Sequence, residues 1–174
     1  FFPSMAMPEV SAAGARWRGA TVLVARAVEY PTGSPLDPLR ELLSQALHGP
    51  RSAQIELMLP AETMASLGEL YPPWLGRAAL PELPPPQAHT RLVRSLTDVF
   101  LALADMSPHI LVLDDLHWAA PALWDVVAAL FASASGSRLL IGMAYRRPDI
   151  EHSDGWRLVQ QWERTGRLAA LSLD

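Results

Sequence analysis

The chain has 174 residues, half of them hydrophobic and 18% charged, so the composition allows one domain with a core and excludes a disordered chain. Its formal net charge of −4 at pH 7 gives no overall attraction to nucleic acids or to anionic membranes. The absence of cysteine excludes disulfides, cysteine-ligated metals and thiol catalysis.

The first half of the chain predicts a strand followed by helices. Residues 20–25 form a compact β-branched run of strand length. A helix is expected from Asp37, with Asp37 as the N-cap, Pro38 at the first helical position and a stop at Gly49-Pro50. Residues 51–70 continue at roughly helical spacing.

A proline-rich segment divides the two halves. Residues 71–86 hold six of the 16 prolines, a density that excludes a regular helix or a central strand. We therefore expect a surface excursion or a semi-rigid connector within one domain. From Gln87 to about Asp105 the apolar residues recur at three- and four-residue intervals, which predicts an amphipathic helix.

The second half alternates strands and helices. Residues 110–113 are apolar without alternation, as in a strand that is buried on both faces of a parallel sheet. A helix over 121–131, a second buried strand over 139–144, a short helix near Trp156 and a last strand over 168–173 follow. This order predicts an α/β fold with a doubly wound, mostly parallel sheet flanked by helices, and residues 1–174 form one domain.

Two places follow predicted strands, where doubly wound sheets bind ligands. Asp114 and Asp115 come directly after the run at 110–113, and Arg146 follows the run at 139–144. Adjacent carboxylates at a strand end suit Mg²⁺ and the activation of a water molecule, but they also suit a turn that caps the next helix. Arg146 suits a phosphate, or it is a surface arginine before Pro148. The spacing leaves these alternatives open.

His117 follows the two aspartates in the string D-D-x-H. A metal-dependent hydrolase that uses Asp114, Asp115 and His117 is one interpretation of this string. The other histidines are scattered without metal-ligand spacing, and a hydrogen-bonded structural histidine is the simpler interpretation.

The string I-L-V-L-D-D-L-H-W at 110–118, with Ala119-Ala120-Pro121 after it, resembles the Walker B segment of STAND-type AAA-like ATPases. These P-loop NTPase modules occur in large LuxR-type transcriptional regulators and related signalling proteins. Residues 19–30 and 38–43 resemble the family's second strand and the following helix, and residues 142–146 resemble the strand that ends in a sensor arginine.

The resemblance implies a role for each candidate residue. Asp114 would be the Mg²⁺-associated Walker B aspartate, Asp115 would polarise the hydrolytic water, and Arg146 would detect the γ-phosphate of ATP. The domain would then be an ATP-binding and ATP-hydrolysing switch in signalling or transcription. Any contact with DNA would be made by domains outside this segment.

The sequence departs from the family at the phosphate-binding loop. No Walker A motif occurs in residues 1–19, and all 14 basic residues are arginine, so the motif's lysine is missing. Ala120 also stands where the family usually has an aspartate that caps the next helix. We therefore expect a partial domain, incomplete at its N-terminus, that alone binds ATP weakly or not at all. The missing first strand would leave a gap between 139–144 and 168–173 and favour self-association through open strand edges.

Two further expectations concern the setting of the protein. No apolar run reaches the roughly 18 residues of a membrane span, and the opening residues do not form a secretory signal, so we expect a cytoplasmic protein without membrane contact. A second interpretation of the same residues is a non-catalytic interaction module that keeps the α/β fold and lacks nucleotide chemistry.

Overall fold

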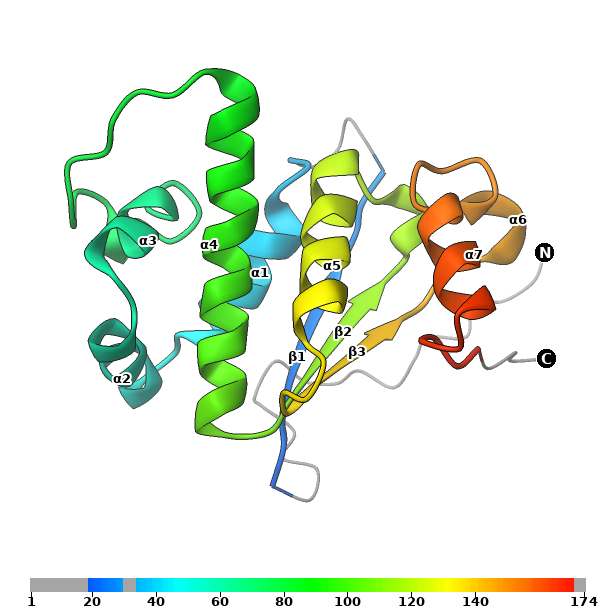
Figure 1. Ribbon diagram of the computed structural model, residues 1–174, viewed down its shortest axis with the longest axis horizontal. Helices are drawn as coiled ribbons and strands as arrows, with labels where there is room; N and C mark the ends of the chain where they lie inside the picture. The colour runs from blue at the N-terminus through cyan, green and yellow to red at the C-terminus, as the bar shows by residue number, and fades with distance from the viewer. Residues whose placement is uncertain (1–18, 30–33, 171–174) are drawn as a thin grey trace.

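The computed structural model describes residues 19–29 and 34–170. Within these residues, three strands form the sheet, and helices lie between and after them (Figure 1). The strands are β1 (Thr21–Arg26), β2 (His109–Asp114) and β3 (Leu139–Met143). The helices are α1 (Asp37–Ala46), α2 (Pro50–Met58), α3 (Ala61–Ser66), α4 (Pro85–Met106), α5 (Pro121–Ser133), α6 (Arg147–Ile150) and α7 (Trp156–Arg164), with 3₁₀ turns η1 (Pro72–Trp74) and η2 (Leu116–Trp118).

The sheet is parallel and has the order β1-β2-β3. Leu23 of β1 is level with Leu111 of β2, which is level with Ile141 of β3. Long segments that contain helices connect the strands, as parallel pairing requires. The predicted α/β fold, with a parallel sheet flanked by helices, is confirmed.

The two faces of the sheet differ in burial. On one face, Leu23, Ala25, Leu111 and Leu113 are buried in the main core with residues of α1, α4 and α5. On the other face, Ile110 and Val112 are only half-buried, and Leu140 is 62% exposed. The expectation that both strands are buried on both faces is therefore wrong for this second face. The apolar run does not reveal it, because the identity of a side chain does not say whether another layer covers it.

The outer edge of β1 is closed by a side chain from α1. The N–H of Val24 donates to Oε1 of Gln45 over 2.9 Å, and Nε2 of Gln45 donates to the carbonyl of Val24 over 2.7 Å. One amide side chain thus satisfies both backbone groups that Val24 turns away from β2. This contact removes one site at which another strand could pair.

The outer edge of β3 is open among the described residues. The carbonyl of Arg138 and the N–H of Ala144 both bond to β2, so the alternation of a strand turns the backbone of Leu139, Ile141 and Met143 away from it. Residues 168–170 form no strand, which contradicts the predicted strand there, and residues 171–174 lie outside the described part. Among the described residues, β3 pairs with β2 and with no strand on its other side.

The proline-rich segment is anchored more firmly than a surface excursion. Trp74 in η1 is fully buried, and its Nε1 donates to Oε1 of Glu56 over 3.0 Å. Pro85 and Pro86 form the first turn of α4, where a residue without an N–H is tolerated. Residues 71–84 contain no α-helix or strand, as predicted, but the prediction is wrong for residues 85–86, which are helical. The buried indole makes the segment part of the core.

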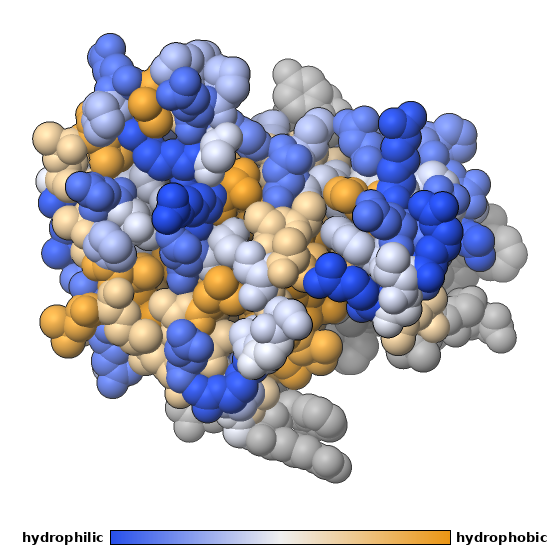
Figure 2. All heavy atoms as spheres, in the orientation of Figure 1, coloured by the Kyte–Doolittle hydropathy of each residue, from blue (hydrophilic) through white to orange (hydrophobic). Residues whose placement is uncertain are grey.

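The predicted helices are present, but their bounds differ in places. Residues 51–70 form two helices, α2 and α3, and α4 begins at Pro85 where the pattern predicted a start at Gln87. α1 begins at Asp37 itself, and its N-cap residue, Leu36, makes no side-chain cap. The Asp37 carboxylate instead accepts the N–H of Ser34 over 2.7 Å. The aspartate therefore fixes the incoming turn from inside the helix. α7 buries Val159 and Trp162 against the body, and Figure 2 shows hydrophilic residues on the outer side of this region.

Candidate functional site

The two predicted acids lie at the carboxyl end of the central strand. Asp114 is the last residue of β2, and Asp115 follows it in the left-handed region at φ 53°. Within the described residues, no other non-glycine residue has a positive φ. The N–H of Asp115 donates to Oδ1 of Asp114 over 2.9 Å. This local bond stabilises a sharp turn that aspartate tolerates better than most residues.

Arg26 holds the side chain of Asp115. Arg26 ends β1 and is in register with Asp114, so its side chain starts beside the acidic turn. Its Nε donates to Oδ2 of Asp115 over 2.5 Å, and its Nη2 forms an ion pair with the same oxygen. The hydrogen bond and the charge of Asp115 raise the pKa of Arg26 above its usual value. Sequence reasoning missed Arg26, although a basic residue at the end of a neighbouring parallel strand was an available signal.

Arg146 lies at the same rim of the sheet. The end of β3 is joined to the acidic turn by two backbone bonds, Ala144 N–H to Leu113 carbonyl over 2.8 Å and Leu116 N–H to Ala144 carbonyl over 3.0 Å. Arg146 comes two residues after Ala144 and is exposed. Among the described residues its guanidinium has no ion-pair partner, so it does not contact either acid. The structure thus brings Asp114 and Asp115 together with Arg26, and places Arg146 three residues beyond the end of β3, without an ion-pair partner among the described residues.

His117 is buried beside this turn. Its side chain is 2% exposed, and its Nε2 lies 4.0 Å from Oδ2 of Asp149 in α6. Within residues 19–29 and 34–170, no three histidine or acidic side chains are grouped so that they could hold a metal ion. The interpretation as a metal hydrolase with Asp114, Asp115 and His117 as ligands is therefore wrong for this arrangement, because His117 faces α6.

The acids fit a magnesium ion that is shared with a phosphate. Oδ1 of Asp114 accepts the Asp115 N–H, and the described part of the structure gives its Oδ2 no hydrogen-bond partner. Mg²⁺ bound to a nucleotide needs only one or two carboxylates, because phosphate oxygens and water complete its shell. The phosphate side is different, since the chain has no lysine and no Walker A motif. The residues present therefore fit the metal and do not supply the phosphate cradle.

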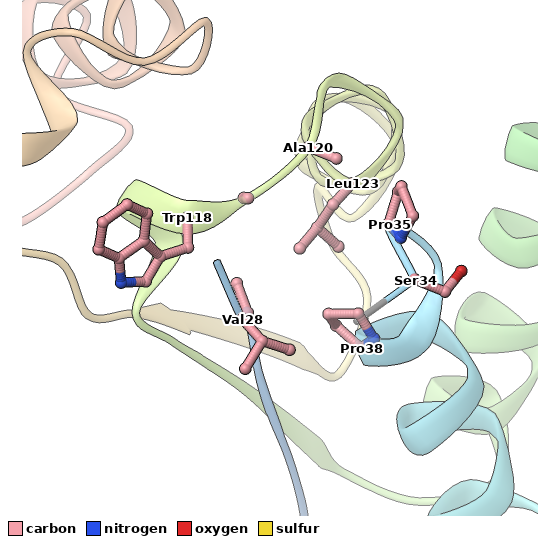
Figure 3. A pocket seen from close by; sticks show the side chains of 9 residues that line it. Val28, Ser34, Pro35, Pro38, Trp118, Ala120 and Leu123 are labelled. Atoms are coloured by element: carbon pink, nitrogen blue, oxygen red, sulfur yellow. The ribbon is translucent and has the colours of Figure 1, made fainter. Parts of the chain in front are cut away.

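An apolar hollow lies between the segment that follows β1, the start of α1 and the segment from Trp118 to the start of α5 (Figure 3). Trp118 and Val28 border it and are both about half exposed, although both are large and apolar. The start of α5 also borders the hollow. Ala120, the N-cap residue of α5, makes no side-chain hydrogen bond to the helix, as expected for an alanine. The lining residues of the hollow are Ala27, Val28, Ser34, Pro35, Pro38, Trp118, Ala119, Ala120 and Leu123.

A comparison with protein-family models matches residues 6–141 to the AAA ATPase domain. The chain belongs to the AAA ATPase domain family. The searches of curated proteins and of solved structures gave no match. AAA ATPase domains are nucleotide-binding and nucleotide-hydrolysing, and the parallel sheet flanked by helices is consistent with the P-loop NTPase-like fold of the family. The matched residues include Asp114 and Asp115 and end before Arg146.

The described helices were compared with the length and hydropathy of a membrane-spanning helix. None of the helices in residues 19–29 and 34–170 has the length and apolar character that a membrane span requires.

Proposed function

We propose that this chain is the part of a STAND-type ATP switch domain that carries the Walker B acids and the sensor arginine. In this proposal Asp114 associates with Mg²⁺, Asp115 polarises the hydrolytic water and Arg146 detects the γ-phosphate. The observation that supports it best is the placement of the acidic pair at the end of β2, with a free arginine beyond the neighbouring strand. Open parallel α/β sheets bind their ligands at this rim.

Each residue has the chemistry that its role requires. The free Oδ2 of Asp114 can face a cation. Asp115 follows directly, so a water molecule held by it would lie near the same phosphate. Arg146 has a planar, permanently charged group that suits terminal phosphate oxygens. Bound Mg²⁺ would neutralise charge on the phosphates. Asp115 can polarise water only through an oxygen that Arg26 does not occupy.

The setting of this function follows from the same proposal. We place the domain in a cytoplasmic, LuxR-type regulator or a related signalling protein, in which ATP hydrolysis switches conformation. Contact with DNA is assigned to domains outside residues 1–174, because this chain carries a formal net charge of −4. The chain alone is expected to bind ATP weakly, since it offers no lysine for the β- and γ-phosphates.

A second candidate is a non-catalytic interaction module with the same fold. The lack of lysine and of a Walker A motif favours it. If the gene encodes residues before Phe1, their sequence separates the candidates. A G-x-x-x-x-G-K-[ST] motif within a few dozen residues favours the ATPase, and a degenerate segment favours the interaction module.

The decisive experiment measures Mg-ATP binding and hydrolysis by the protein as its gene encodes it. We expect Asp114→Asn to weaken the Mg²⁺ dependence of binding and Asp115→Asn to abolish hydrolysis while ATP still binds. Asp105→Asn is the matched control, because Asp105 is exposed and lies at the opposite end of the sheet. Hydrolysis that survives Asp115→Asn, or equal effects of all three changes, would contradict the proposed roles.

A further inference from the structure

His117 is a polar side chain in an apolar position. Its side chain is 2% exposed, and Nδ1 is buried without a hydrogen-bond partner in the described structure. Burying an imidazole with an unsatisfied nitrogen costs free energy that an aliphatic residue would avoid. The position therefore calls for an explanation beyond packing.

The second imidazole nitrogen faces a carboxylate. Nε2 of His117 lies 4.0 Å from Oδ2 of Asp149, whose side chain is 48% exposed. The described structure shows no other partner for this carboxylate. If Nε2 carries the proton, Nδ1 is an unpaired acceptor, whereas the opposite tautomer would bury an unpaired N–H donor. The surroundings therefore favour the tautomer in which Nε2–H points to Asp149.

Asp149 belongs to the turn that begins with Arg146. The backbone N–H groups of Asp149 and Ile150 both donate to the carbonyl of Arg146, over 3.1 and 3.0 Å. Ile150 is fully buried and anchors α6. A shift of Asp149 therefore moves the peptide that follows Arg146.

His117 belongs to the turn that carries Asp115. It follows Asp115 by two residues in η2, and the carbonyl of Asp115 accepts the N–H of Trp118 over 2.9 Å. The pair of His117 and Asp149 thus connects the turn after β2 with the turn after β3. The distance of 4.0 Å is too long for a hydrogen bond, and an approach of about 1 Å would form a charge-assisted one.

We propose that His117 and Asp149 are positioning residues that couple the turn of Asp115 to the turn of Arg146. In this proposal the two side chains approach from 4.0 Å to form a hydrogen bond from Nε2–H to the Asp149 carboxylate. That approach draws α6 toward η2 and sets the separation of the turn of Asp115 from the turn of Arg146. The consequence for ATP hydrolysis rests on the proposed function. The coupling itself is a property of this chain and is testable without nucleotide.

The first test uses NMR of the protein without nucleotide. The imidazole spectrum of His117 should show the Nε2–H tautomer, and Asp149→Ala should shift the backbone amide resonances of Asp115 and Leu116. The matched control is Glu151→Ala, in the same segment, which loses an exposed contact with Arg147. It should leave the resonance of Asp115 in place. An Nδ1–H tautomer of His117, or an Asp115 amide resonance that does not shift in Asp149→Ala, would overturn the coupling.

Two substitutions at His117 test whether a nitrogen at the place of Nε2 is sufficient to keep the Asp115 amide in its wild-type position. The side-chain nitrogen of His117→Gln reaches the place of Nε2, and that of His117→Asn reaches only the place of Nδ1. We expect wild-type amide positions for Asp115 in His117→Gln and shifted ones in His117→Asn. Since both changes occur in the core, urea unfolding first confirms that each folds. If either fails to fold, the surface change Asp149→Ala decides the outcome alone.

The second test is kinetic and uses the protein as its gene encodes it. Asp149→Ala should lower kcat for ATP hydrolysis about 10- to 100-fold through misplacement of the reacting groups, with KM nearly unchanged. Equal loss in Glu151→Ala, or a change in KM alone, would contradict the positioning role. If the wild type hydrolyses no ATP, the proposed function fails, and the NMR result still accepts or rejects the coupling.

Discussion

Arg26 donates from Nε to Oδ2 of Asp115 over 2.5 Å and so joins the last residue of β1 to the first residue beyond β2. The Arg26 side chain is 66% exposed and that of Asp115 is 18% exposed. An ion pair this open to water adds little stability. Its effect is to fix the direction of a carboxylate whose backbone is already held in the left-handed region.

Substitutions at Asp115 should separate the contribution of the ion pair to the free energy of unfolding from that of the left-handed backbone. Asp115→Asn and Asp115→Ala both remove the ion pair with Arg26, but only asparagine tolerates the left-handed backbone well. We expect Asp115→Ala to have a free energy of unfolding about 1 kcal/mol below that of Asp115→Asn. Arg26→Ala should cost less than about 1 kcal/mol. Urea unfolding measures all three, and equal stability of the two Asp115 variants would show that the turn carries no strain.

The contact of Gln45 with Val24 predicts a graded loss of stability. Gln45→Leu leaves the N–H and the carbonyl of Val24 without their amide partner and should cost about 2 kcal/mol. Gln45→Glu keeps an acceptor for the N–H but loses the donor to the carbonyl, so we expect at least as large a loss near neutral pH. Gln54→Leu, at an exposed position of α2, serves as the control. If Gln45→Leu unfolds like this control in urea, the edge contact is unimportant.

Because His109 is buried, we expect the protein to be less stable at acidic pH. His109 is 2% exposed, and burial lowers the pKa of its imidazole, helped by the charges of Arg51 and Arg138 and opposed by a hydrogen bond to the Ser107 carbonyl. The unfolded chain therefore binds a proton at a higher pH than the folded one. The contribution of His109 is complete above the unfolded pKa of about 6.5 and is lost progressively as the pH falls below it.

Urea unfolding at pH 7.5 and 5.5 tests the role of His109. The wild type should be less stable at pH 5.5, and His109→Gln should reduce this difference. His48→Gln is the control, because His48 is exposed. A protein whose stability rises on acidification, or a His109→Gln variant with the full difference, would show that another group controls the effect.

The open face and edge at β3 predict self-association. Leu140 is 62% exposed, and β3 has no described strand on its outer side. We expect sedimentation velocity to show concentration-dependent association that Leu140→Arg weakens by placing a charge at the sheet edge. Leu57→Arg is the control at an 89% exposed leucine of α2, away from the sheet. A wild type that stays monomeric at all concentrations would contradict this prediction.

The sequence predicted the local elements well where one pattern dominated. The runs at 20–25 and 110–113 are strands, and the amphipathic segment from Gln87 is α4. Errors arose where distant residues decide the outcome. Trp74 turns a proline-rich segment into part of the core because it is buried against α2. The predicted strand at 168–173 is absent from its described residues, because an apolar run forms a strand only where tertiary contacts place it alongside a sheet edge, and the local sequence does not encode that placement.

For the candidate site, the sequence by itself determined where the two acids lie, at the end of a strand. Four apolar residues end in Asp114 and Asp115, so a buried strand must place both at its carboxyl end, and Arg146 follows a second strand in the same way. Only the tertiary structure decided that Arg26 donates a hydrogen bond to Asp115 and that His117 faces Asp149. These partners are 89 and 32 residues apart in the chain, and parallel pairing brings them together by aligning strand ends that no local pattern relates.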